Sequence, residues 1–370
     1  MNNKSATTTY KPLKKLKFQD KTGFQIELIR RVEELFQNTE LQKRDCPEMY
    51  LKTVIILLSF AATYVFLVFL AQKWWEALLS DIALALLMCL IFFNIMHDGS
   101  HNSYSKLPWV NKLMAMTIEL VGFSSYYWKF GHTVLHHKYT NIQSYDQDFD
   151  FGYSARKSPF QQWFSYHRWQ HYYIWLLYGY YATEWTLISD FRNILTGKFY
   201  ALNYLRPKGV NLAIFLVGKI VFFTLAFGIP LMFHSVSTVL ICYTITSFIM
   251  GLVLNLVFTW AHEVEETIFF LPSEENNIIE NEWSIHQVET TVNLSCNKFL
   301  SWFLGGLNFQ IEHHLFPHIC HVNYPAIAPL VEKTCQEYGI KYQKHQSILS
   351  AISSHFRFLR HLGMSKEYSS

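Results

Sequence analysis

Four long apolar segments divide the chain. They cover residues 53–71, 77–96, 211–233 and 236–261. At a rise of ~1.5 Å per residue, a helix of about 20 residues crosses the hydrocarbon layer of a bilayer, which is roughly 30 Å thick. The turns inside each pair of segments are very short, and only Asp81 and Lys219 place a charge within a segment. The pattern predicts an all-α integral membrane protein whose four transmembrane helices form two hairpins.

The remaining segments are more polar and set the expected domain organisation. Residues 1–50 form a basic N-terminal segment, in which 24–36 has the periodicity of an amphipathic helix. This N-terminus has no apolar run of the kind that a cleaved signal peptide needs. Residues 51–320 hold the spans and the segments between them, and residues 321–370 are expected to form a C-terminal tail. Between the spans, 107–127 is expected to be a partly embedded helix.

Charge indicates the orientation in the membrane. Lys and Arg lie almost entirely outside the two tight turns, and positive segments stay on the cytoplasmic side. Both termini and the central segment are therefore expected in the cytoplasm. The net charge of +3 and the lack of a basic patch argue against nucleic-acid binding. The six cysteines include no CxxC pair, so we expect reduced thiols.

Three histidine clusters lie in the polar segments, at or beyond the ends of spans. Their members are His97 and His101; His132, His136 and His137; and Gln310, His313 and His314. Within each cluster a spacing of four residues places two side chains on one face of a helix. Neutral imidazole is a ligand for zinc, copper, iron or nickel. Seven histidines and a glutamine exceed one tetrahedral zinc site and suit two metal ions.

A single histidine pair at this spacing is weak evidence for a metal. His167 and His171 share the spacing, within a segment crowded with Trp and Tyr, and we interpret them as interfacial packing or contacts with lipid headgroups. Charge predicts, without reference to the histidines, that all three clusters lie on the same face of the membrane. The expected location of all three clusters on one face of the membrane favours one joint metal site.

The clusters resemble the three histidine boxes of the membrane fatty-acid desaturases. The matching motifs are His97-Asp98-x-x-His101, His132-x-x-x-His136-His137 and Gln310-x-x-His313-His314. Gln310, in place of a histidine, resembles the front-end branch, which inserts a double bond between an existing one and the carboxyl end. The resemblance runs from about Ser59 to Tyr342.

This resemblance implies a fold, a reaction and cofactors. A cytoplasmic helical cap would hold two iron ions, with O₂ as co-substrate. The enzyme would introduce a cis double bond into a fatty acyl chain carried by CoA or by a phospholipid. The family also implies a further histidine ligand before the third box, for which His262 and His286 are both candidates. Asn94, Asp98 and Glu312 are candidates for hydrogen bonding to ligand imidazoles from outside.

Electrons must reach such a site from elsewhere. Many front-end desaturases carry a fused haem domain with a His-Pro-Gly-Gly signature, which this sequence lacks. A ferredoxin or a cytochrome-b5-like protein is therefore the expected donor. Other functions stay open, among them a metal transporter. A hydroxylase acting on an acyl chain or an alkane uses the same boxes, and a zinc-dependent intramembrane hydrolase would need only about three of the histidines.

Overall fold

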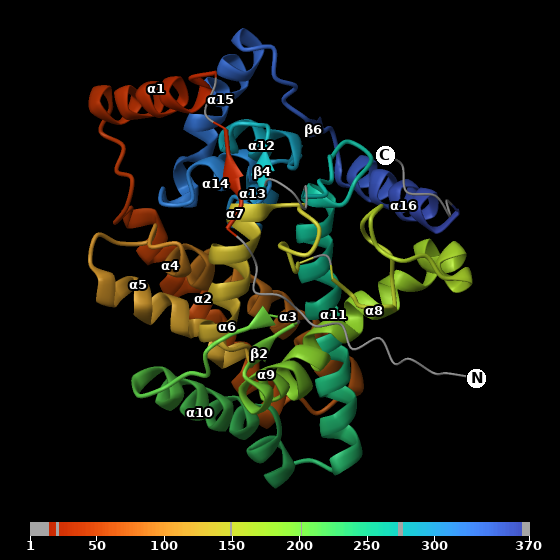
Figure 1. Ribbon diagram of the computed structural model, residues 1–370. Coiled ribbons are helices and arrows are strands. Elements are labelled where there is room, and N and C mark those ends of the chain that lie inside the picture. Colours follow the sequence, from red (N-terminus) through yellow and green to blue (C-terminus); the bar gives the residue numbers. More distant parts are fainter. Residues whose placement is uncertain (1–14, 20–21, 149, 201, 273–276, 365–370) are drawn as a thin grey trace, which may run out of the picture.

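The computed structural model describes residues 15–19, 22–148, 150–200, 202–272 and 277–364. Most of this chain is helical, with three short strand pairs (Figure 1). Residues 1–14 of the basic N-terminal segment and residues 365–370 of the expected tail lie outside the described residues.

Four helices in the described ranges are long and apolar enough to cross a membrane, as the sequence predicts. The first joins α2 (Pro47–Val65) to the π-helix η1 (Phe66–Leu70), and the second joins α3 (Trp74–Leu90) to η2 (Ile91–Met96) and α4 (His97–Ser100). The third comprises α10 (Val210–Phe223), η7 (Thr224–Gly228) and η8 (Pro230–Met232), and the fourth is α11 (Val236–His262). The first helix begins at Pro47 rather than at residue 53, because proline suits the first helical position.

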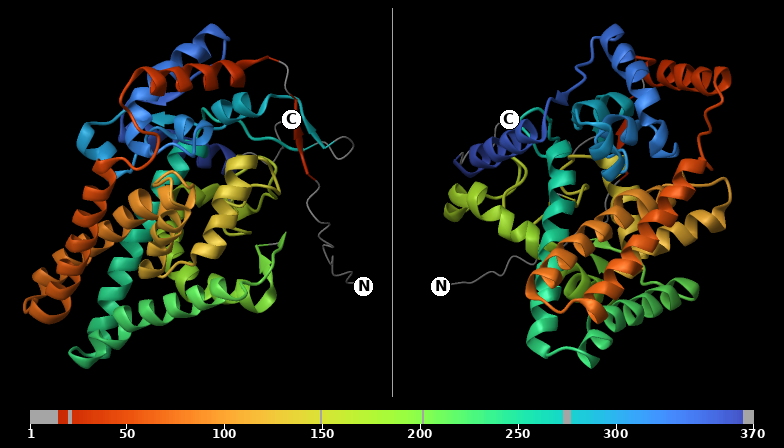
Figure 2. Two further views of the ribbon diagram at one scale, coloured as in Figure 1. Left: turned by 90° about the vertical axis from the view of Figure 1, so that its left-hand side faces the viewer. Right: turned by 180° about the vertical axis from the view of Figure 1, so that it is seen from behind.

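The second and fourth spans form the centre of the bundle. The apolar window of Trp74–Ser100 is 67% buried within the protein, whereas those of Pro47–Leu70 and Val210–Met232 are 17% and 22% buried. α11 packs against both α3 and α8 (Gln170–Glu184). Figure 2 shows the spans at one end of the molecule and a layer of helices across the other. The first and third spans therefore leave most of their apolar surface for lipid.

The contact between α11 and α8 depends on glycine. A Cβ atom at Gly251 would lie 2.6 Å from the carbonyl oxygen of Tyr178 and 2.7 Å from that of Gly179. Both are backbone atoms, which cannot rotate away. Gly251 therefore allows the two helix backbones to approach each other closely.

Gly251→Ala is expected to destabilise the protein by about 1–3 kcal/mol, because the helices must separate to admit the methyl group. Thermal unfolding of the detergent-solubilised protein measures the effect. Gly228→Ala is the matched control, since its Cβ would meet no atom closer than 3.8 Å. Equal melting temperatures for the two variants would refute the close approach.

Lys219, the charge inside the third span, faces protein instead of lipid. Its Nζ lies 2.7 Å from Asp190 Oδ2 and donates to the carbonyl oxygens of Gly122 (2.6 Å) and Thr186 (3.2 Å). The side chain is almost completely buried, as is that of Asp190. One ammonium group thus links the third span to two segments that lie between spans.

The chain between the second and third spans is a series of short helices. Its first half comprises α5 (Pro108–Ala115), η3 (Met116–Val121), α6 (Ser125–Lys129), η4 (Phe130–His136) and α7 (His137–Tyr139). The single helix expected over 107–127 is broken at Gly122, whose φ of 91° ends η3. This break turns the second histidine box toward the end of the second span.

The second half of this connection covers the bundle. It comprises η5 (Ser165–Trp169), α8, η6 (Trp185–Ser189), α9 (Asp190–Thr196) and an antiparallel pair of strands, β2 (Lys198–Phe199) and β3 (Leu202–Asn203). One face of α8 packs on α11, while Tyr172, Leu176 and Tyr180 are more than half exposed. That aromatic face suits the headgroup layer expected from the sequence.

A helical layer lies across the end of the spans. It consists of α1 (Phe24–Asn38), α12 (Trp283–Glu289), α13 (Lys298–Phe303), α14 (Gln310–Leu315), η9 (His321–Asn323) and α15 (Tyr324–Glu337). The strands β1 (Lys17–Phe18) and β4 (Ile278–Ile279) pair in parallel, as do β5 (Asn293–Leu294) and β6 (Lys344–His345). Phe24, Leu28, Val288, Ile311 and Val331 share one buried core.

The segment expected as a tail is packed against the rest of the protein. α15 contacts α1, β6 pairs with β5, and α16 (Ile348–Met364) packs against η5, α8 and α11. Leu359 and Leu362 of α16 are buried, so the helix uses an apolar face to attach itself. The described part of this segment therefore belongs to the body of the protein.

Candidate metal centre

The first histidine box lies at the end of the second span. The backbone N–H of His101 donates to the carbonyl oxygen of His97, so the helix continues one further turn as the spacing predicts. The two ring centroids are 4.8 Å apart. Both side chains are buried, so neither imidazole is simply exposed to water at the end of the helix.

The second box lies on the wider turn of the π-helix η4. Rings of His132 and His136 stack with centroids 5.2 Å apart, and His137 follows at the start of α7. π-turns occur often at functional sites. Here the turn directs all three imidazoles into the protein, where each is at least 95% buried.

The third box lies on the short helix α14, which a pair of glycines brings close to the first box. Gly305 and Gly306 have φ of 61° and 73°. A Cβ at Gly305 would collide with the carbonyl oxygen of Phe93, just before the first box. The absence of a side chain at Gly305 thus lets this loop lie against the second span.

The boxes do not form three separate sites; they mix into two adjoining groups. The first histidine group is His97, His101, His132 and His313, and the second is His136, His262 and His314. Within each group, one candidate ligand atom per residue lies within 4.8 Å of every other. His137 lies between the groups, 4.5 Å from His313 and 4.3 Å from His314 by ring centroids.

Unpaired ring nitrogens show that both groups fit metal ions. Nε2 is buried without a hydrogen-bond partner among the described residues in His101, His136, His262, His313 and His314. An unpaired buried polar atom costs free energy unless something binds it. The donor set is entirely imidazole, which suits a transition metal.

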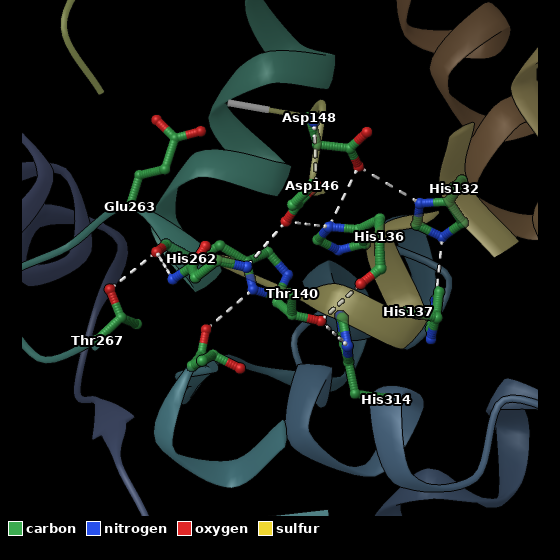
Figure 3. Close-up of polar contacts among 12 residues, drawn as sticks. His132, His136, His137, Thr140, Asp146, Asp148, His262, Glu263, Thr267 and His314 are labelled. Atoms are coloured by element: carbon green, nitrogen blue, oxygen red, sulfur yellow. Dashed lines mark hydrogen bonds and ion pairs between the residues drawn. The ribbon is translucent and has the colours of Figure 1, made fainter. Parts of the chain in front are cut away.

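Hydrogen bonds on the opposite nitrogen point these Nε2 atoms inward. Nδ1 of His136 donates to Asp146 at 3.0 Å, as Figure 3 shows, and Nδ1 of His314 donates to Gln287 Oε1 at 2.8 Å. Nδ1 of His262 donates to the carbonyl oxygen of Thr290 at 3.1 Å. These acceptors fix the proton on Nδ1, which leaves the Nε2 lone pair available for a metal.

Burial keeps most of these imidazoles in the neutral form that ligates metals. Desolvation, helped by neighbouring imidazoles, lowers the pKa of His101, His132, His137, His313 and His314 well below the usual value. His136 differs. Burial lowers its pKa, but the carboxylates of Asp146 and Asp148 outweigh that effect and raise the pKa to about 9. This carboxylate contact increases the basicity of the His136 ring.

The two candidates for an additional ligand are placed differently. His262, at the end of α11, belongs to the second histidine group. His286 lies outside both groups: its Nε2 donates to the carbonyl oxygen of Thr140 at 2.8 Å, and its ring packs between Phe18 and Phe270. Gln310 lies beside His262 with its amide nitrogen buried and unpaired.

The three residues expected to support the ligands bond elsewhere. Asp98 accepts from His321 Nδ1 at 3.0 Å, and Glu312 accepts from Asn293 and Tyr342. Asn94 donates to two backbone carbonyls. The groups that do accept from cluster imidazoles include Asp146 and Gln287. Asp146 lies in the acidic row after the second box, which the sequence analysis did not connect with the histidines.

The histidine pair outside the boxes has no place in either group. His167 accepts from the backbone N–H of Phe164 and bonds the carbonyl oxygen of Tyr153. His171 packs against Tyr172 and Phe356. Both side chains are buried and make these contacts within the protein, which agrees with a role outside the metal centre.

Residues 72–346 match the fatty acid desaturase family. That range includes all three boxes, His262 and His286. The chain belongs to this family. As a fatty acid desaturase, it is an enzyme of lipid metabolism, and its apolar helices and histidine groups are those that the family resemblance led us to expect.

Relatives of the desaturase match nearly its whole length. It is 37% identical over 351 residues to an sn-1 linoleoyl-lipid 6-desaturase of Synechocystis sp., covering 94% of this chain and 98% of the relative. It is 38% identical over 362 residues to a protein of the same description from Arthrospira platensis, covering 95% and 96%. An acyl-lipid (8-3)-desaturase of Physcomitrium patens is 35% identical over 358 residues, covering 93% of this chain and 72% of the relative.

A small cavity adjoins the histidine groups of the desaturase. It has a volume of about 50 Å³ and borders His132, His136 and His262 at one end. Phe92, Phe123, Trp185 and Leu254 give it an apolar wall, while the carboxylates of Asp146, Asp148 and Glu263 are part of its polar wall. The apolar wall of this cavity offers a surface for a hydrocarbon close to the histidine groups.

Asp146→Asn is expected to weaken metal binding by about tenfold to 100-fold, because the carboxylate that orients His136 and raises its basicity is lost. Titration of the metal-free protein with Fe²⁺ under anaerobic conditions measures this. Asp150→Asn removes the same charge from the same loop and serves as the control, because Asp150 accepts from Gly152 N–H and not from a histidine of either group. An Asp146→Asn protein with undiminished affinity would exclude the role.

Proposed function

We propose that this desaturase introduces a cis double bond into an acyl chain of a membrane lipid at a pair of iron ions. The observation that carries the proposal is the juxtaposition of two histidine groups, each with unpaired Nε2 atoms, and a cavity with an apolar wall. The first histidine group would hold one iron and the second the other, with His137 between them. Bound iron supplies the activation of O₂ that breaking unactivated C–H bonds requires.

The overall reaction fixes what must be supplied from outside. One –CH₂–CH₂– unit becomes –CH=CH–, and O₂ is reduced to two molecules of water. The substrate gives up two electrons and two protons, so a donor must supply two further electrons and solvent two further protons. We infer a separate electron-transfer protein, either a ferredoxin or a cytochrome-b5-like protein, as this donor.

The protein's own residues bind and position the chain. Methylene groups have no polar handle, so the walls of the cavity must select the reacting carbons. Phe92, Phe123 and Trp185 offer apolar surface, and the buried histidines lie at one end of that surface. Burial also limits water near the reacting carbons. The lysine-rich segments favour an active site on the cytoplasmic face.

The names of the relatives favour an acyl-lipid substrate over an acyl-CoA. Two of them are described as acting on a linoleoyl group at the sn-1 position of a lipid. Gln310 in the third box supports the same front-end type, with the new bond on the carboxyl side of an existing one. A hydroxylase with the same boxes is the alternative that an experiment must exclude.

Expression of the chain in a bacterial host that lacks this activity, followed by gas chromatography and mass spectrometry of each lipid class, tests the proposal. We expect a fatty acid lighter by two hydrogens, mainly at one glycerol position, and dependent on O₂. A product that gains oxygen without a new double bond would establish the hydroxylase instead. Feeding linoleate distinguishes front-end insertion from insertion into a saturated chain.

A further inference from the structure

A second cavity continues the first toward the far end of the spans. It has a volume of about 290 Å³ and lies among the four membrane helices. The same helices border both cavities in succession: Leu254 borders the small cavity, and Met250, one helical turn away, borders the large one. In the second span, Phe92 likewise borders the small cavity, and Met88, one helical turn away, borders the large one. The two cavities therefore follow one another along the bundle.

Three aromatic rings lie at the boundary between the cavities. Phe92 and Phe123 are 5.8 Å apart by ring centroids, and Phe123 and Trp185 are 5.7 Å apart. All three border the small cavity, while the neighbouring Thr186 borders the large one. Leu254, at the same level, is eight residues from His262, or about 12 Å along the helix axis. The rings thus close the cavity at a fixed depth from the histidines.

Trp185 is held in place by a buried ion pair, which consists of Asp190 and Lys219. Its Nε1–H donates to Asp190 Oδ1 at 3.0 Å, and Asp190 Oδ2 pairs with Lys219 Nζ at 2.7 Å. Lys219 also donates to the carbonyl oxygens of Gly122 and Thr186, which flank Phe123 and Trp185 in sequence. A charged side chain inside an apolar span costs free energy, so such residues usually have a specific role. Here it fixes two of the three rings.

We propose that Trp185 is a specificity-determining residue that sets which carbons of the acyl chain reach the histidine groups, and that Asp190 and Lys219 are its positioning residues. This rests on the proposed function, since it requires the small cavity to be the acyl site. The depth at which the end of an acyl chain stops in the cavity decides which of its carbons lie next to the histidine groups. A ring locked by a hydrogen bond gives one depth and therefore one double-bond position.

The test compares double-bond positions in lipids from cells that express each full-length variant. Trp185→Phe keeps an aromatic ring but removes the hydrogen bond, so the ring can shift. We expect the ratio of the main positional isomer to its neighbours to fall about tenfold, since a displacement near 1 Å already changes rates by that order or more. Mass spectrometry of derivatised fatty acids measures the ratio.

Two further variants separate positioning from folding. Lys219→Met combined with Asp190→Asn removes the charges together, so neither is left buried alone, and is expected to lower the isomer ratio in the same direction. Trp175→Phe is the matched control: its Nε1–H donates to the carbonyl oxygen of His171 in its own helix, and it borders neither cavity. It should retain the wild-type ratio.

An unchanged isomer ratio in Trp185→Phe, with iron content equal to the wild type, overturns the inference. If the wild-type chain forms no new double bond at all, the proposed function fails instead, so the two failures are distinct. Should the double variant not accumulate in the membrane, Trp185→Phe decides alone.

Discussion

Replacing His314 with alanine is expected to abolish product formation and to lower bound iron to about half or less. His314 belongs to the second histidine group and its Nδ1 donates to Gln287, so its loss removes one ligand from a group of three. A group with two remaining imidazoles binds a transition metal far more weakly. Iron per protein molecule and the fatty acid profile of the expressing cells measure the two effects.

His361→Ala provides the matched control. His361 is an exposed residue of α16, so its removal changes the histidine count without touching either group. It should retain both iron and activity. Full activity in His314→Ala would mean that the histidine groups are not the catalytic metal site.

His262→Ala and His286→Ala are expected to fail in different ways. The family resemblance leaves both as candidates for a further ligand, but only His262 lies in a histidine group. His262→Ala should lose iron and activity while the protein still folds. His286→Ala removes a ring buried between two phenylalanines and a donor to Thr140, so it should mainly lower stability, by about 1–3 kcal/mol.

Thermal unfolding and iron content, measured on both purified variants, separate these outcomes. The decisive comparison is iron retained per folded molecule, which should be low for His262→Ala and close to wild type for His286→Ala. Equal loss of iron from both variants would contradict the assignment of His262 alone to the second group.

Sequence pattern alone predicts the spans and the first box well. The apolar runs give four helices, and the spacing of His97 and His101 at a span end correctly indicates one more helical turn. The first inference depends on the length of the apolar runs and the second on the helical spacing of four residues, and both are local properties of the chain. The side chains on the other faces of these helices must then contact lipid or another part of the protein.

The spacing of the histidines along the chain does not predict which of them lie together in each group. His132 and His136 share one helix turn, yet each joins a different group. The π-turn of η4 and the close approach at Gly305 decide this, and both are tertiary features. Asp146 was missed for a related reason: its bond to His136 forms because the loop folds back, ten residues after the ligand.

Asp98 shows the opposite error. Its place between His97 and His101 favours a role beside the ligands, but its carboxylate turns away to His321. Neighbours in a helical sequence point in different directions, so adjacency to a ligand is a poor guide to contact with one.

The mixed membership of the two histidine groups has a consequence for biosynthesis. His97, His101 and His132 leave the ribosome long before His313, and the second hairpin must enter the membrane between them. The first group is complete only when His313 has been made, and the second only when His314 has been made. Completion of the candidate metal site is therefore a late step in the maturation of the enzyme, and a nascent chain that stalls in the second hairpin has neither histidine group complete.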